Sequence, residues 1–129
     1  MTRAHPGLYT RYFLDVARTH GGLDHAANFM NLYLIPNMGH CGGNAATDRF
    51  DMLAPMVDWV ENKVAPDTIA ASGTNFLSTL GTLTGLPTTR SRPLCPFPKT
   101  LRYISGDMAL ATSYACHYHR RKESIKSPL

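Results

Sequence analysis

The strongest constraint on the fold of this 129-residue chain is a short loop of sequence GHCGG at residues 39–43. An apolar run at residues 32–35 precedes the loop and ends at Pro36. Glycines adopt backbone angles that other residues resist, so the chain can turn sharply directly after the apolar run. A general base needs a fixed position within hydrogen-bond reach of its partners. His40, held in such a loop, is therefore a candidate catalytic residue.

The segments on either side of the loop predict helices around a buried strand. Apolar residues at helical spacing predict a helix over residues 8–18, which the glycines at 21–22 end. Residues 31–35 are apolar without alternation, which is typical of a strand buried on both faces in a parallel sheet. The apolar stripe expected on the first helix consists of Leu8, Tyr12, Phe13 and Val16.

A second helix is predicted over residues 49–63. Asp48 is a plausible N-cap, and Asp51 stands where a capping box has its acidic residue. Pro55 lies inside this helix, where a proline removes a backbone hydrogen bond and costs about 3 kcal/mol.

The C-terminal half is richer in turns. Residues 69–71 predict a short strand or an extended arm, and residues 72–93 predict a long loop. Residues 107–118 predict a short helix that begins near Asp107. The resulting fold class is α/β, with an incomplete parallel sheet and flanking helices. It is typical of the end of a larger domain, which we place at residues 1–118, with a basic disordered tail at 119–129.

Charge and apolar content disfavour nucleic-acid and membrane partners. The net charge is +4, and the basic residues gather in the tail rather than on a patterned face. No stretch approaches the roughly 20 apolar residues of a membrane span, and the N-terminus has no apolar signal-peptide core. The chain has 3 cysteines, an odd number that suggests a partner outside the chain or a free thiol.

No cofactor or metal motif is apparent. The glycines do not fit a phosphate-binding loop, and no C-x-x-C or H-E-x-x-H spacing occurs. Metal binding through Cys116, His117 and His119 therefore stays a minor alternative. The chain also lacks the G-x-S-x-G turn of a nucleophilic serine, and Ser72 before Gly73 has none of that context.

Several stretches, in order, resemble the tannase and feruloyl esterase family over residues 9–116. The histidine segment at residues 34–43 resembles the histidine segment of that family. Further matching stretches are residues 50–53 with 57–61, residues 65–72, and residues 92–99 with 102–103, followed by Cys116 at the position of a closing cysteine.

The resemblance implies an α/β-hydrolase core with a serine, aspartate and histidine triad, in which His40 matches the histidine. It implies that Cys41 bonds to the residue before the nucleophilic serine, outside this chain, and that Cys95 pairs with Cys116. It further implies aromatic acid esters as substrates and a secreted or periplasmic location. Neither Asp15 nor Asp24 matches the triad aspartate. Asn37, Asn44 and Pro55 depart from the family pattern.

Two classes of function follow. The first is a C-terminal portion of a serine carboxylic ester hydrolase, inactive alone because the nucleophile and aspartate are absent. The second is a non-catalytic remnant or small interaction domain that keeps the scaffold. In either case, apolar faces of the isolated chain should remain uncovered.

Overall fold

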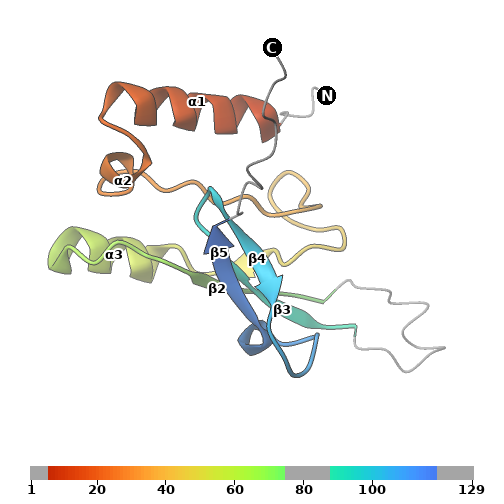
Figure 1. Ribbon diagram of the computed structural model, residues 1–129. Coiled ribbons are helices and arrows are strands. Elements are labelled where there is room, and N and C mark those ends of the chain that lie inside the picture. The colour runs from red at the N-terminus through yellow and green to blue at the C-terminus, as the bar shows by residue number, and fades with distance from the viewer. Residues whose placement is uncertain (1–5, 75–87, 119–129) are drawn as a thin grey trace, which may run out of the picture.

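A computed structural model gives the structure of the protein at residues 6–74 and 88–118 (Figure 1). The predicted tail at residues 119–129 and the middle of the predicted loop at 72–93 lie outside this range. Among the described helices, none combines the length and the apolar character that crossing a bilayer requires. In chain order the elements are α1 (Pro6–Thr19), α2 (Leu23–Ala26), β1 (Arg49–Phe50), α3 (Leu53–Asn62), β2 (Ile69–Gly73), β3 (Arg90–Leu94), β4 (Lys99–Tyr103), the 3-10 turn η1 (Ala111–Ser113) and β5 (Tyr114–Tyr118).

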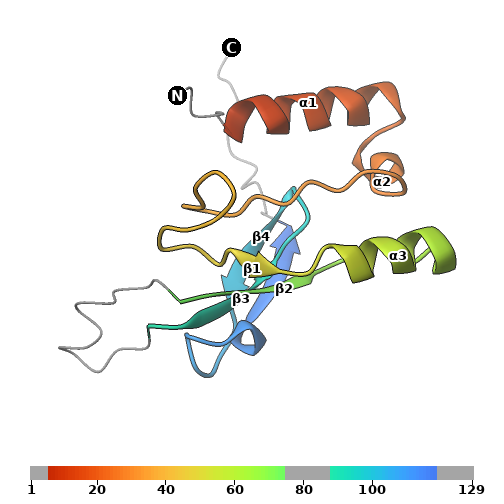
Figure 2. The ribbon, with the colours of Figure 1, turned by 180° about the vertical axis from the view of Figure 1, so that it is seen from behind.

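Helix α1 confirms the helix predicted over residues 8–18. Its buried side chains are Phe13 and Ala17, and the Phe13 ring meets the Phe97 ring edge-on with centroids 5.9 Å apart. The helix ends where the Gly22 N–H donates to the Ala17 carbonyl over 2.7 Å, a bond typical of a glycine C-cap. Figures 1 and 2 show α1 on one side of the molecule, the strands on the other and residues 31–48 passing between them.

Strand β2, which was predicted at residues 69–71, is the centre of a three-stranded antiparallel sheet of order β1-β2-β3. Ile69 pairs with Leu94 and Ala71 with Arg92. Ile69, Ala71 and Leu94 are buried together and form the core of this sheet. The end of β2 at residues 72–73 and strand β3 correct the prediction of a loop over residues 72–93.

Strands β4 and β5 form an antiparallel pair, and β5 corrects the helix predicted over residues 107–118. Asp107 does begin a turn, since its Oδ1 accepts from the Ala109 N–H over 2.8 Å. The turn does not continue as a helix, because its backbone carbonyl and N–H groups form hydrogen bonds with strand β3 instead of with each other. The Ser91 N–H donates to the Ala109 carbonyl, and the Ser91 Oγ accepts from the Ala111 N–H. The following residues then pair with β4.

Residues 31–35 are extended but do not form the predicted strand. Their one ladder contact among the described residues is an antiparallel bridge between Tyr33 and Pro96, next to a bond from the Phe97 N–H to the Leu32 carbonyl. Proline has no N–H to donate, so the ladder stops there. The α/β class is confirmed by the helices and sheets, while every strand pairing in the described ranges is antiparallel.

Helix α3 begins four residues later than predicted, and this shift removes the expected cost of Pro55. The Asp51 Oδ1 accepts from the N–H groups of Leu53 and Ala54, over 2.8 and 3.3 Å, so Asp51 rather than Asp48 caps the helix. Pro55 then lies in the first turn, where backbone N–H groups have no partner within the helix. At the other end, Lys63 takes a left-handed conformation with φ 60°.

Candidate active-site loop

The loop that carries His40 is closed by two side chains, one near each end. The Asp48 Oδ2 accepts from the Gly43 N–H over 2.6 Å. The Asn37 Nδ2 donates to the Ala45 carbonyl over 3.3 Å. Asp48, predicted as a helix cap, therefore holds the loop instead. A carboxylate shortly after a glycine-rich loop was the available sequence signal for this role.

The glycines of the loop are required by close backbone contacts. A Cβ on Gly39 would lie 2.9 Å from the Gly42 carbonyl oxygen, which is too close for any other residue. Gly42 has φ 120°, and a Cβ there would meet the Asp48 Oδ2 at 3.2 Å. Glycine at positions 39 and 42 is thus needed to form the tight turn that carries the histidine.

Several non-glycine residues of the loop also take left-handed backbone conformations. Asn37, Cys41 and Asn44 have φ of 63°, 64° and 61°. Asparagine accepts this conformation readily, whereas cysteine rarely does. Asn37 and Asn44, the departures from the family pattern, therefore suit the loop. The unfavourable angle at Cys41 is the kind of local strain that concentrates at functional sites.

His40 and Cys41 both face solvent. The His40 Nδ1 lies 2.9 Å from the Cys41 Sγ, and Cys41 is a free thiol. Within residues 6–74 and 88–118, Cys41 is the one side chain in hydrogen-bond contact with His40, and no carboxylate meets the ring. The two predicted site residues are adjacent, and a triad aspartate is not among their described contacts.

The expected disulfide is present. Cys95, just after β3, bonds to Cys116 in β5, with Cα atoms 5.5 Å apart. The bond ties the end of the three-stranded sheet to the β4–β5 pair. Of the minor metal alternative, Cys116 is held in this disulfide and His119 lies outside the described residues, within which no group of three or more ligating side chains could hold an ion.

A polar network fixes the extended segment that leads into the loop. The Tyr33 hydroxyl donates to the Pro66 carbonyl over 2.8 Å, and the Asn31 Nδ2 donates to the same oxygen. Burial, and secondarily the charge of Asp67, raises the pKa of Tyr33 to about 12. Asp67 also pairs with Lys99, and this hydrogen bond raises the pKa of the lysine ammonium. Sequence reasoning did not identify this network, because its members are distant in the chain.

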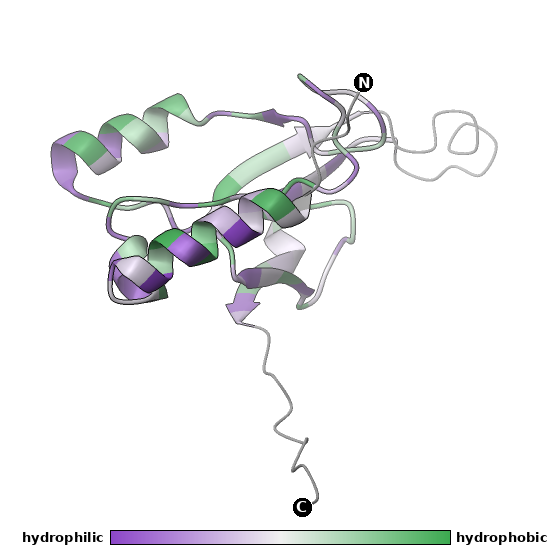
Figure 3. Ribbon diagram, turned by 90° about the horizontal axis from the view of Figure 1, so that it is seen from above, coloured by the Kyte–Doolittle hydropathy of each residue, from purple (hydrophilic) through white to green (hydrophobic). Residues whose placement is uncertain are grey.

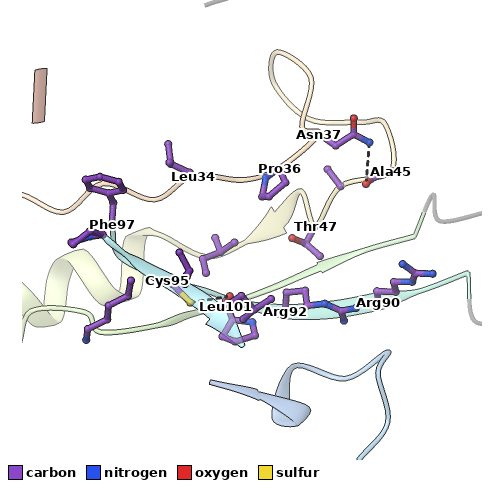
Figure 4. A pocket seen from close by; sticks show the side chains of 16 residues that line it. Leu34, Pro36, Asn37, Ala45, Thr47, Arg90, Arg92, Cys95, Phe97 and Leu101 are labelled. Carbon is purple, nitrogen blue, oxygen red and sulfur yellow. Dashed lines mark hydrogen bonds between the residues drawn. The ribbon is translucent and has the colours of Figure 1, made fainter. Parts of the chain in front are cut away.

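A groove of about 550 Å³ lies between the base of the loop and strands β3 and β4 (Figure 4). It is lined mainly by apolar groups, with Asn37 and Thr47 from the loop side and Arg90 and Arg92 from β3. Arg92 is stacked over the Tyr114 ring at 4.3 Å. His40 does not line the groove, so the structure does not place the candidate base in this cavity.

Comparison with known proteins gives consistent matches. Residues 4–117 match the family model for tannase and feruloyl esterase. The chain is 47% identical over 93 residues to mono(2-hydroxyethyl) terephthalate hydrolase from Piscinibacter sakaiensis, covering 70% of this chain and 14% of that protein. It is 33% identical over 114 residues to a probable feruloyl esterase from Arthroderma benhamiae, covering 87% of this chain and 20% of that protein.

The fold also matches solved structures. The crystal structure of feruloyl esterase B from Aspergillus oryzae aligns with a TM-score of 0.63 and 24% sequence identity, over 87% of this chain and 24% of that chain. This chain therefore spans less than a quarter of each of these proteins. The match to the family model extends over most of the chain and includes the histidine loop. The chain belongs to the tannase and feruloyl esterase family.

Proposed function

We propose that this chain supplies the general base, His40, of a serine carboxylic ester hydrolase. The observation that carries the proposal is the loop itself. The loop is tied by Asp48 and Asn37, crowded at Gly39, and presents an accessible imidazole in a chain of an esterase family. A base must be held in one position and still be reachable, and this loop satisfies both conditions.

In the proposed mechanism the serine and the triad aspartate come from protein outside this sequence. His40 takes the proton from the serine hydroxyl as the serine attacks the ester carbonyl, and then gives it to the leaving alcohol. A water molecule repeats the sequence to release the acid, and His40 again accepts and returns a proton. No cofactor is needed for these steps.

Cys41 is proposed to form a disulfide with a cysteine outside this chain, next to the nucleophilic serine. Its thiol is exposed and unpaired within the described residues, which leaves it available for such a bond. The bond would tether the base to the nucleophile. An oxidising location, secreted or periplasmic, is proposed on the same grounds, and the Cys95–Cys116 disulfide supports it.

The proposed substrates are aromatic acid esters, such as hydroxycinnamate or gallate esters. The names of the relatives, which refer to terephthalate and feruloyl esters, support this class. The rival proposal is a non-catalytic remnant or small interaction domain. The absence of a carboxylate beside His40 among the described residues favours it for the chain alone.

A chimera tests the catalytic proposal. This chain replaces the aligned segment in the Piscinibacter hydrolase, and turnover of mono(2-hydroxyethyl) terephthalate is measured. We expect an active chimera that His40→Ala reduces by about 10⁴-fold or more, since triad members act as a unit. The matched control is His117→Ala. His117 is another exposed histidine and lies on β5, so this variant should retain activity.

The chain by itself should hydrolyse methyl ferulate and methyl gallate no faster than buffer. Activity of the His40→Ala chimera equal to that of the His117→Ala chimera would reject His40 as the base. Turnover by the isolated chain that depends on His40 would reject the need for an external serine.

A further inference from the structure

The carboxylate of Asp48 lies against the turn that carries His40. Its Oδ2 accepts from the Gly43 N–H over 2.6 Å, and a Cβ on Gly42 would meet the same oxygen at 3.2 Å. A carboxylate that accepts from a backbone N–H forms a charge-assisted bond, about twice as strong as a neutral one. The side chain of Asp48 therefore holds the backbone of the two glycines that follow His40 and Cys41.

The backbone of Asp48 is in turn fixed to the core of the chain. Strand β1 begins at the next residue, and both of its residues pair with residues 71–72 of β2. The two residues before Asp48 are buried, with Ala46 2% and Thr47 7% exposed. The Asp48 carboxylate thus joins an exposed loop to a buried part of the molecule.

The other hydrogen bonds that close the loop connect its own residues. The Asn37 Nδ2 donates to the Ala45 carbonyl, and the Gly42 N–H donates to the Gly39 carbonyl, each over 3.3 Å. Both bonds are longer than the bond of Asp48, and both would move with the loop. Within the part of the chain that the structure describes, the tip of the loop is therefore joined to the sheet through Asp48.

We propose that Asp48 is the positioning residue of His40, and that its carboxylate couples the loop to the β1–β2 pair and so fixes the imidazole for proton transfer. The inference rests on the proposed function for the role of His40 as the base. A misplacement of about 1 Å at a catalytic group can cost about 100-fold in rate, and release of the loop at Gly43 allows such a displacement. Asp48 does not contact the substrate in this proposal, so its loss should lower kcat and leave KM nearly unchanged.

Steady-state kinetics of the chimera with the Piscinibacter hydrolase test this role. Asp48→Ala should lower kcat for mono(2-hydroxyethyl) terephthalate by about 100-fold, with KM changed by about twofold or less. Asp48→Asn keeps an oxygen that can accept from the Gly43 N–H, so it should restore most of the rate and lose about tenfold or less.

Asp51→Ala is the matched control. The Asp51 carboxylate also accepts from backbone N–H groups, those of Leu53 and Ala54 at the start of α3. Figure 3 shows α3 extending away from the strands, so loss of this cap should affect the helix and not the loop. Asp51→Ala should therefore keep kcat. Equal losses of kcat in the two alanine variants would make Asp48 a structural residue only and overturn the inference, as would a loss that appears in KM.

Amide hydrogen exchange in this chain, measured by NMR, tests the contact without catalysis. The Gly43 N–H should exchange about tenfold or more faster in Asp48→Ala than in the wild type, because a hydrogen bond to a charged group resists opening. Asp51→Ala should leave this exchange unchanged.

The inference and the proposed function can fail separately. Faster exchange at Gly43 in Asp48→Ala, with an inactive wild-type chimera, supports the coupling of loop and sheet and rejects the proposed function. An active chimera that keeps its kcat in Asp48→Ala overturns the inference and leaves His40 as the base. Equal exchange at Gly43 with and without the carboxylate also overturns the inference.

Discussion

The β2–β3 pair and helix α3 both carry apolar faces, but only the strand pair buries its own. Ile69 and Leu94 face each other across the two strands, and each is 4% exposed. Among the described residues, the apolar side chains of α3 have no such neighbour, and Leu53 is 73% exposed. The strand pair finds its partners within this chain, and the Cys95–Cys116 bond ties it to β5. The helix keeps a regular local structure without tertiary contacts that bury its side chains, so in this chain local structure and packing are separable.

The largest effect should come from removing the disulfide, which would disturb the strand region alone. The bond closes a loop with a sequence separation of 21, for which the chain-entropy model gives roughly 3 kcal/mol. We expect the Cys95→Ser/Cys116→Ser double variant to lose about that much free energy of unfolding in chemical denaturation.

Cys41→Ser is the control and should leave the free energy of unfolding unchanged. Thiol labelling of the oxidised, unfolded chain should modify Cys41 and no other residue. Similar losses from the control and the double variant would show that the disulfide does not hold the strand region together.

The difference in burial between β3 and α3 can be tested with the same substitution, leucine to alanine, in each element. Leu94→Ala should cost about 2.5 kcal/mol, because it opens a cavity in the small core. Leu53→Ala should cost less than about 0.5 kcal/mol in the isolated chain, because the side chain is already in water. Denaturant unfolding measures both changes. Equal costs would mean that α3 is packed in solution against something within the chain.

A smaller effect is expected at the start of α3. Asp51→Ala removes the acceptor for the N–H groups of Leu53 and Ala54, and a lost N-cap costs about 1 kcal/mol. Because α3 is not packed, the loss should appear as faster amide hydrogen exchange in α3, with exchange in β2 unchanged. Asp51→Asn keeps an acceptor and should retain most of the protection. If amide hydrogen exchange in α3 were unchanged in Asp51→Ala, Asp51 would not cap the helix.

The smallest effect concerns the polar network around Tyr33, in the segment that leads into the histidine loop. The pKa of Tyr33 is raised from 10.0 to about 12, chiefly by burial and then by Asp67. A raised pKa favours the neutral phenol in the fold, so this contribution is fully present below pH 10 and is lost as the pH rises through about 12. Solvent screening of the partly exposed ring limits it to about 1 kcal/mol or less.

Ultraviolet titration should therefore find a tyrosine that ionises near pH 12 and is missing in Tyr33→Phe. Stability of the wild type should fall more than that of Tyr33→Phe between pH 10 and 12. Identical titrations of the two proteins would contradict the burial of the phenol.

Local patterns were sufficient where a segment depends on its own residues. The spacing over residues 8–18 predicted α1, and the glycines after it predicted its end. The GHCGG sequence predicted a tight loop, because the close approach of Gly39 to Gly42 excludes other residues. The family motifs predicted the Cys95–Cys116 pair, which residue spacing alone left open.

The tertiary structure decided what depends on residues distant in the chain. Residues 107–118 became a turn and a strand because β3 and β4 supplied hydrogen-bond partners that a local helix pattern cannot include. Residues 31–35 gained a single bridge because the segment opposite is rich in proline. The sequence by itself predicted a helix in the region of α3 and the tight loop that presents His40. Only the tertiary structure decided which apolar faces are buried within this chain, since burial requires a partner surface as well as a pattern.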